Sequence, residues 1–128
     1  NIIELTKKFN IKGIIVSNTT DKNRENLNGK HKNETGGLSG EPLNEISNKL
    51  IKKFYKEAKN NITIIGVGGV NSGLSAYEKL KSGASLLQLY TGMIYEGPEI
   101  VKKIKSELIY IFKKEKVKKI TDIIGVGS

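Results

Sequence analysis

The sequence predicts an α/β protein in which parallel strands alternate with helices. Three short apolar runs, at residues 13–17, 62–66 and 85–90, are continuous rather than alternating, which is typical of parallel strands covered on both faces. Helical patterns separate these runs, and such alternation indicates parallel strands joined by helical crossovers. The predicted order is helix, strand, long loop, helix, strand, helix, strand, helix.

The number of strands narrows the architecture. A (β/α)8 barrel needs eight strands over roughly 250 residues, whereas this chain has 128 residues and three strand-like runs. We therefore expect residues 1–128 to be a single partial domain, the C-terminal part (about strands 6 to 8) of such a TIM barrel. A truncated doubly wound sheet is the alternative. The chain does not begin with Met, and residues 1–13 resemble the tail of a helix, so we expect a fragment of a longer protein.

Each later helix has its own apolar face. Residues 44–59 carry a stripe that recurs every four residues, formed by Ile46, Leu50, Phe54 and Ala58. Residues 72–83 should end at Gly83, which supplies a left-handed stop, and their inward side chains are Ala76, Tyr77 and Leu80. Residues 97–115 should have Pro98 in the first helical turn, and their apolar face consists of Ile100, Ile104, Leu108, Ile111 and Phe112.

The segment from 21 to 43 is too long for an ordinary connection between a strand and a helix. Its first part, residues 21–33, is polar and fits an insertion. Its second part is dense in glycine and ends with Pro42 near a helix start. Long loops at the carboxyl ends of strands often act as lids, so we expect residues 21–43 to form a lid-like loop.

The formal net charge of +9 comes almost entirely from Lys, with Arg24 the only Arg. Nucleic-acid recognition favours Arg for its bidentate geometry, and most Lys residues fall on helix faces opposite the apolar stripes. A solvated surface is therefore favoured over a basic binding module, and we expect no nucleic-acid partner. The chain has no Cys and one His, His31, in a polar loop, which argues against a metal site.

The ends of the three strands carry the polar groups that can do chemistry. These ends are residues 17–20, 66–71 and 90–92, and ligands bind at this edge in both parallel architectures. They offer hydroxyls, a carboxamide and backbone N–H groups, but no acid, His or Lys. Such a set suits an uncharged polar ligand together with a phosphate, and it suits neither a metal nor a Ser-His-Asp arrangement.

The glycine-rich stretch at residues 66–71 resembles a dinucleotide fingerprint only at first. If the pattern starts at Gly66, Asn71 stands where the third glycine belongs, and the acidic residue expected about twenty positions later is absent. Gly68 and Gly69 instead allow a ligand to approach the backbone closely. Asn71 or Ser72 can cap a following helix whose N-terminus favours an anion.

In many barrels the loops after strands 7 and 8 bind a phosphate. Here those loops would supply Gly68, Gly69, Tyr90 and Thr91, which we call the phosphate clamp. A plain strand-to-helix turn is the alternative for the two glycines.

Five motifs then occur in order: IIVSNTT (14–20), ETGGLSGEPL (34–43), IIGVGGVNSG (64–73), GASLLQLYTG (83–92) and TDIIG (121–125). Together they resemble the C-terminal portion of the dihydroorotate dehydrogenase family, most closely its membrane-associated, quinone-using class 2. The resemblance implies an FMN-containing (β/α)8 barrel. Such an enzyme oxidises (S)-dihydroorotate to orotate in pyrimidine synthesis and passes the electrons to ubiquinone.

The resemblance also implies roles for individual residues. Ser17 and Gly40 would contact FMN, and Ser17 stands where the family often has Thr. The FMN phosphate would be bound through the backbone and the Thr hydroxyl by Gly69, Tyr90 and Thr91, with Gly68 allowing close approach. The orotate ring would be hydrogen-bonded by Asn18 and Thr19, since a carboxamide can both donate and accept.

Other parts of the family's machinery lie upstream of these residues. They are the catalytic Ser base, the FMN-binding Lys, further substrate-binding Asn residues and the N-terminal helical pair that forms the quinone and membrane contact. We therefore expect no catalytic residue here and no activity from this chain alone. By resemblance the enzyme would sit at the mitochondrial inner membrane, or at the bacterial inner membrane in a prokaryote. Another FMN-binding or phosphate-binding barrel enzyme is the alternative.

Overall fold

The computed structural model describes residues 2–22, 24–58 and 61–128. Its centre is a sheet of three parallel strands in chain order: β1 (Gly13–Val16), β2 (Thr63–Val67) and β3 (Leu86–Gln88). The register places Ile15 beside Ile65, and Ile65 beside Leu86. The predicted parallel α/β arrangement is confirmed for this part of the chain.

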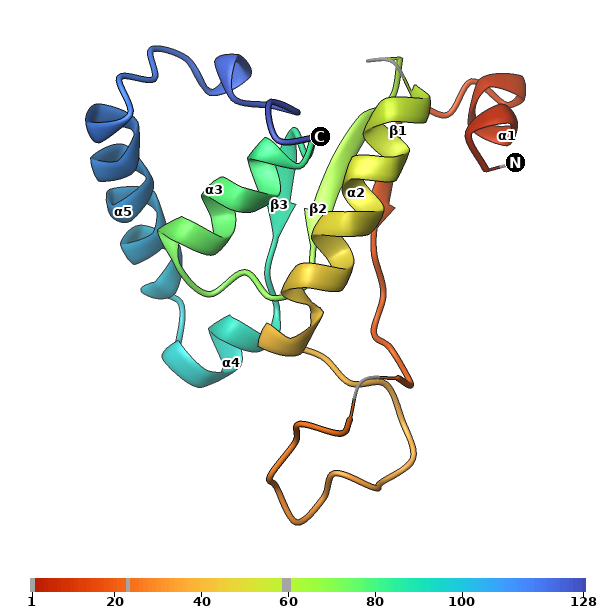
Figure 1. The fold of residues 1–128 in the computed structure, drawn as a ribbon, viewed down its shortest axis with the longest axis vertical. Helices are drawn as coiled ribbons and strands as arrows, with labels where there is room; N and C mark the ends of the chain where they lie inside the picture. The colour runs from red at the N-terminus through yellow and green to blue at the C-terminus, as the bar shows by residue number, and fades with distance from the viewer. Residues whose placement is uncertain (1, 23, 59–60) are drawn as a thin grey trace.

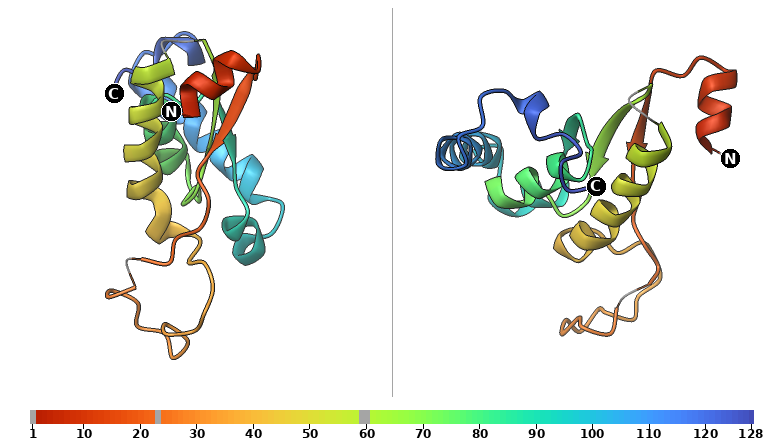
Figure 2. Two further views of the ribbon diagram at one scale, coloured as in Figure 1. Left: turned by 90° about the vertical axis from the view of Figure 1, so that its right-hand side faces the viewer. Right: turned by 45° about the horizontal axis from the view of Figure 1, so that its top comes forward.

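Helices alternate with the strands (Figure 1). They are α1 (Ile2–Lys8), the 3-10 turn η1 (Glu41–Leu43), α2 (Asn44–Ala58), α3 (Gly73–Lys81), α4 (Thr91–Glu96), α5 (Ile100–Lys114) and the 3-10 turn η2 (Ile120–Asp122). α1 and α5 lie at opposite edges of the sheet, as the right-hand view in Figure 2 also shows. No helix in the described part of the chain is both long enough and apolar enough to cross a bilayer.

One face of the sheet is covered by helices and the other is open. Val16 and Ile64 are buried against Ile51 of α2. On the opposite face, Ile15 is 57% exposed and Leu86 is 56% exposed. The expectation that both faces are covered therefore holds for only one face within the described residues, although the strands carry apolar side chains on both.

The buried side of α2 differs from the predicted stripe. Ser47, Ile51 and Ala58 are buried, whereas Ile46 and Leu50 are half-buried and flank that line. The reason is that the hydroxyl of Ser47 donates a hydrogen bond to the carbonyl of Val67 at 2.6 Å. This contact turns the polar Ser47, rather than Ile46, toward the sheet, a rotation that apolar spacing alone does not reveal.

The predicted helix over 97–115 is wrong at its start, and the predicted strand over 85–90 is too long. β3 ends at Gln88, the short helix α4 follows, and α5 begins only at Ile100. Gly97 ends α4 with φ of +74°, and its N–H donates to the carbonyl of Met93 at 2.9 Å. Pro98 lies in the turn between the two helices.

The apolar face of α5 and the predicted ends of α3 are confirmed. Ile100 and Ile104 pack with Val70 and Ala76. Ser72 caps α3 by accepting a hydrogen bond from the N–H of Ser75. The chain leaves α3 through Gly83, whose φ of +116° is the left-handed conformation that a helix stop requires.

The segment between β1 and η1 extends beyond the carboxyl ends of the strands (Figure 1). Its two ends are joined where the N–H of Leu38 donates to Thr20 O at 2.7 Å and the N–H of Thr20 donates to Leu38 O at 3.1 Å. The guanidinium of Arg24 donates to the carbonyls of Lys32, Glu34 and Gly36. The loop is therefore pinned both at its neck and across its interior.

Candidate functional site

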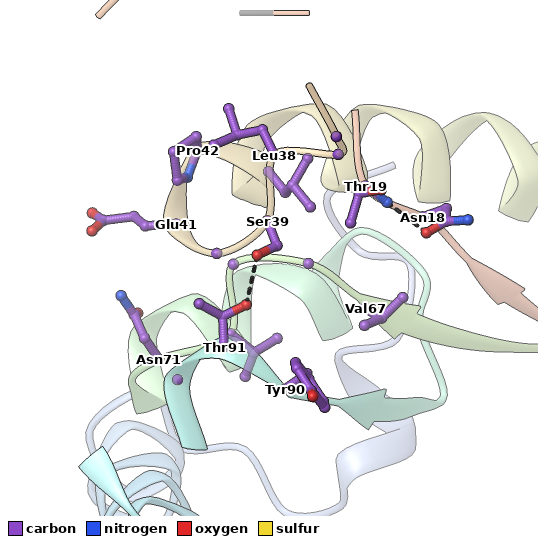
Figure 3. A pocket seen from close by; sticks show the side chains of 18 of the residues that line it. Asn18, Thr19, Leu38, Ser39, Glu41, Pro42, Val67, Asn71, Tyr90 and Thr91 are labelled. Atoms are coloured by element: carbon purple, nitrogen blue, oxygen red, sulfur yellow. Dashed lines mark hydrogen bonds between the residues drawn. The ribbon is translucent and has the colours of Figure 1, made fainter. Parts of the chain in front are cut away.

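A cleft of about 820 Å³ lies at the carboxyl ends of the three strands. The strand ends, the glycine turn, the start of α4 and the loop before α2 all contribute to its wall (Figure 3). Every residue that the sequence predicted to bind the cofactor or the substrate lines this one cleft: Ser17, Asn18, Thr19, Gly40, Gly68, Gly69, Tyr90 and Thr91. The structure thus brings together residues that lie far apart in the chain.

The end of β1 presents a polar pair to the cleft. Asn18 accepts a hydrogen bond through Oδ1 from the N–H of Thr19 at 2.8 Å, which leaves the carboxamide nitrogen free to donate (Figure 3). Thr19 packs against Gly37 so closely that a Cβ on Gly37 would lie 2.5 Å from Thr19 Cβ. Gly37 was not predicted as a site residue, yet it makes room for Thr19 beneath the loop.

The two glycines at the end of β2 have backbone conformations that other residues rarely adopt. Gly68 has φ of +108° and Gly69 has φ of +72°. A Cβ on Gly68 would lie 3.2 Å from Leu43 Cβ, and one on Gly69 would lie 2.7 Å from Asn44 N. The turn therefore needs glycine at both positions, for conformation and for space.

Among the described residues, the backbone N–H groups of the phosphate clamp have no hydrogen-bond acceptor. Within residues 61–128, no hydrogen bond to another protein group is donated by the N–H of Gly68, Gly69, Tyr90 or Thr91. Unpaired N–H groups along a cleft favour a ligand rich in acceptor oxygens. The N–H set and the glycine cradle both fit a phosphate.

Thr91 connects the clamp to the loop before α2. Its hydroxyl donates to Ser39 Oγ at 3.0 Å (Figure 3). Gly40 has φ of +85°, and a Cβ there would lie 3.1 Å from Thr91 Cγ2. The glycine-dense end of the loop is thus held directly beside the start of α4.

The N-terminus of α3 is already occupied by protein groups. The N–H of Gly73 donates to a carboxylate oxygen of Glu107 from α5, and the N–H groups of Asn71 and Ser72 both donate to Ser75 Oγ. The sequence predicted that an anion would favour this helix end, and here Glu107 is that anion. The N–H groups of the phosphate clamp lie outside this helix end, and none of them donates to an acceptor in the described part of the chain.

Sequence reasoning missed one charged residue below the cleft. Lys79 of α3 is completely buried, contrary to the expectation that Lys side chains lie on solvated faces. Burial lowers the pKa of Lys79 to about 8. Its Nζ donates to Ser47 Oγ at 3.1 Å and to Asn48 Oδ1 at 2.7 Å. The sequence held one weak sign of this burial. Gly66 of β2 has no side chain, and this leaves space for the long side chain of Lys79.

Charged residues at the cleft come from the loop and from α4 rather than from the strand ends. His31 is exposed, as its polar surroundings predicted, and it also pairs with Glu34. Among the described residues, no three His, Asp or Glu side chains gather into a group that could hold a metal ion. The residues that line the cleft from the strand ends carry hydroxyls, carboxamides and peptide groups beside apolar side chains such as Val67 and Leu89.

Comparison with known proteins identifies the relatives of this arrangement. A sequence model of the family described as dihydroorotate dehydrogenase matches residues 1–112. The chain belongs to the dihydroorotate dehydrogenase family. This confirms the resemblance carried by the five sequence motifs, and the family is flavin-dependent in general.

Individual relatives agree with this assignment. The chain is 43% identical to a mitochondrial dihydroorotate dehydrogenase (quinone) of Mus musculus over 98% of its own length and 32% of the relative's. It is 38% identical to a dihydroorotate dehydrogenase (quinone) of Azorhizobium caulinodans, over 97% of this chain and 35% of the relative. The crystal structure of ligand-free dihydroorotate dehydrogenase from Eimeria tenella superposes with a TM-score of 0.92 at 38% identity, covering 98% of this chain and 35% of that one. The chain thus spans about a third of the length of these relatives.

Proposed function

We propose that this chain is the C-terminal part, about strands 6 to 8, of an FMN-dependent dihydroorotate dehydrogenase. The complete enzyme would oxidise (S)-dihydroorotate to orotate in pyrimidine synthesis and pass the electrons to ubiquinone. The observation that carries the proposal is that every residue implied by the family resemblance lines one cleft at the carboxyl ends of parallel strands. The relatives from mouse and Azorhizobium are both named quinone enzymes.

The open face of the sheet supports a complete barrel around this part. Ile15, Ile65 and Leu86 form an apolar row across all three strands, and the outer two are more than half exposed. Further barrel strands would bury this row and pair with the edges of β1 and β3. Without them we expect residues 1–128 to be inactive and prone to association.

FMN fits the cleft through its phosphate. The phosphate would be bound by the N–H groups of Gly69, Tyr90 and Thr91, which have no acceptor in the part of the chain that the structure describes, and Gly68 would let the backbone approach. Ser17 and Gly40 would contact the cofactor from the neighbouring segments of the cleft wall. When bound, FMN supplies the redox chemistry by accepting a hydride.

Asn18 and Thr19 would hold the substrate ring. The free carboxamide nitrogen of Asn18 can donate to a carbonyl of the pyrimidine, and the hydroxyl of Thr19 can donate or accept. Both side chains orient the substrate and are neutral, so they take no proton in the reaction. We propose no catalytic base among these residues; the base would lie on earlier strands of the barrel.

We further propose that the complete enzyme associates with a membrane through an N-terminal segment that precedes the barrel. The relative from mouse is mitochondrial, which supports the mitochondrial inner membrane if the source is a eukaryote. In a prokaryote the bacterial inner membrane would take its place.

The test uses the full-length protein that contains this chain. The purified protein should carry flavin absorbance, and acid-released flavin should be FMN. Replacement Asn18→Ala should weaken orotate binding while FMN stays bound, because Asn18 is proposed to contact only the substrate. A colourless protein that FMN does not reconstitute would rule out the cofactor assignment, and unchanged orotate affinity would rule out the role of Asn18.

A further inference from the structure

Lys79 is a buried charged residue that the proposed reaction does not use. Its side chain is 0% exposed and extends from α3 between α2 and β2. The stem passes so close to Gly66 that a Cβ on Gly66 would lie 2.8 Å from Lys79 Cγ. No carboxylate in the described part of the chain forms an ion pair with it. A buried ammonium with only neutral partners is costly, so its retention calls for a local role.

Two chains of hydrogen bonds start at Lys79 Nζ, and we call them the two arms of the Lys79 network. The first arm leads to the peptide before Gly68. Lys79 Nζ donates to Ser47 Oγ at 3.1 Å, and the Ser47 hydroxyl donates to Val67 O at 2.6 Å. Val67 O belongs to the peptide group that also contains the N–H of Gly68. Because a trans peptide is planar, fixing this carbonyl fixes the direction of that N–H.

The second arm leads to the peptide after Gly69. Lys79 Nζ donates to Asn48 Oδ1 at 2.7 Å, and Asn48 Nδ2 donates to Asn44 Oδ1 at 3.0 Å. Asn44 Nδ2 in turn donates to Gly69 O at 3.0 Å. The orientation of each amide follows from this chain of donors and acceptors. The peptide between Gly68 and Gly69 therefore lies between two peptide planes that Lys79 holds.

We propose that Lys79 is a positioning residue for the phosphate clamp, acting by anchoring both carbonyls that flank the Gly68–Gly69 peptide. The inference rests on the proposed function, since it assigns a purpose to the clamp as an FMN phosphate site. Glycine has the widest conformational freedom of any residue, so a Gly-Gly turn keeps its N–H groups aimed at a ligand only if neighbouring groups restrain it.

The ammonium group also places a positive charge beneath the turn. Its pKa of about 8 leaves it largely protonated at neutral pH. Hydrogen bonds that involve an ionised donor are stronger than neutral ones, so a charged Lys79 holds Ser47 and Asn48 more firmly than a neutral donor would. Screening by solvent is weak for a buried charge, and its attraction for a phosphate acts in the same direction.

The test compares two flavins that share the ring system and differ in the phosphate. FMN and riboflavin are titrated into the flavin-free, full-length protein and its Lys79→Met variant. Met keeps an unbranched stem of similar length and removes the ammonium group. We expect FMN affinity to fall by about tenfold or more, the loss typical of one hydrogen bond to a charged group, and riboflavin affinity to stay unchanged.

A matched control separates positioning from general stability. Leu80→Ala removes a buried side chain of the same helix that is outside the network. This variant should lose thermal stability, and any weakening should affect FMN and riboflavin equally. If Lys79→Met does not fold, Ser47→Ala breaks only the arm to Val67 and should weaken FMN alone, by a smaller factor.

The outcomes distinguish this inference from the proposed function. A selective loss of FMN affinity in Lys79→Met or Ser47→Ala supports the inference. Equal losses for both flavins, or no loss, overturn it while leaving the FMN assignment intact. A wild-type protein that binds neither flavin overturns the proposed cofactor and the inference together.

Discussion

Asn44 and Gly69 fit against each other without space for a β-carbon. Asn44 Nδ2 donates to Gly69 O at 3.0 Å, and a Cβ on Gly69 would lie 2.7 Å from the backbone nitrogen of Asn44. Gly69 also has φ of +72°, which a side chain disfavours. The first turn of α2 and the glycine turn after β2 are therefore fixed relative to each other by this hydrogen bond and by close packing.

Replacement Gly69→Ala should separate these two elements. We expect a loss of about 1–3 kcal/mol in the free energy of unfolding, because backbone strain and overlap act together. FMN affinity should fall in parallel, since the displaced turn carries the clamp N–H groups. Urea unfolding and FMN titration of the full-length protein measure the two effects.

Gly97→Ala is the matched control for Gly69→Ala. Gly97 has nearly the same φ, +74°, but nothing lies within 4 Å of a Cβ built there. The loss of stability in Gly97→Ala should reflect backbone strain alone, and FMN affinity should not change. If both variants lost the same stability and the same FMN affinity, close packing at Asn44 would have no special effect.

The hydroxyl of Thr91 should matter for both the clamp and the loop. Thr91→Val keeps the shape but removes the donor to Ser39 Oγ. We expect FMN affinity to weaken by about 0.5–1.5 kcal/mol and amide hydrogen exchange to rise over residues 35–43. Thr91→Ser keeps the hydroxyl and should preserve both properties. Equal behaviour of the Val and Ser variants would contradict the role of the hydroxyl.

Arg24 should hold the interior of the long loop. Arg24→Ala removes donors to the carbonyls of Lys32, Glu34 and Gly36. We expect faster limited proteolysis between residues 24 and 36 with little change in global stability, since the loop lies outside the core. Lys30→Ala removes one positive charge from the same loop and serves as the control. Equal cleavage of both variants would show that the guanidinium contacts do not restrain the loop.

The elements with regular residue patterns could be predicted from the sequence alone. The three strands, the stop at Gly83 and the apolar face from Ile100 to Ile104 follow from periodicity and glycine chemistry, which are local properties. The grouping of the strand ends also followed, because parallel strands bring their carboxyl ends to one edge. The prediction that Asn18 and Thr91 line one cleft needed no more than that rule.

The remaining features depend on contacts between distant segments. The rotation of α2 depends on the hydrogen bond from Ser47 to Val67, and no pattern within the helix encodes a partner twenty residues away. The break between α4 and α5 depends on Gly97, which the apolar spacing of the later helix concealed. Lys79 looked like a surface residue because its hydrogen-bond partners, the buried Ser47 and the half-buried Asn48, come from a different helix.

The buried ammonium of Lys79 should make stability depend on pH in one window. Burial lowers its pKa from 10.5 to about 8 in the folded protein. Between these two values the unfolded chain binds more protons than the folded one, so stability rises with pH; below and above the window this residue contributes no slope. The groups in hydrogen-bond contact with Nζ, Ser47 and Asn48, do not titrate. In the Lys79→Met variant this contribution to the pH dependence of stability is absent.

The measurement is urea unfolding of the full-length wild type and Lys79→Met at about pH 7 and about pH 10. Stability of the wild type relative to the variant should increase by at most about 3 kcal/mol between these conditions, since one pKa unit corresponds to about 1.4 kcal/mol. Lys53→Met, which removes an exposed lysine of α2, should follow the wild type at both pH values. A constant difference between wild type and Lys79→Met would mean that the ammonium is not desolvated, because only desolvation separates the folded and unfolded pKa values here.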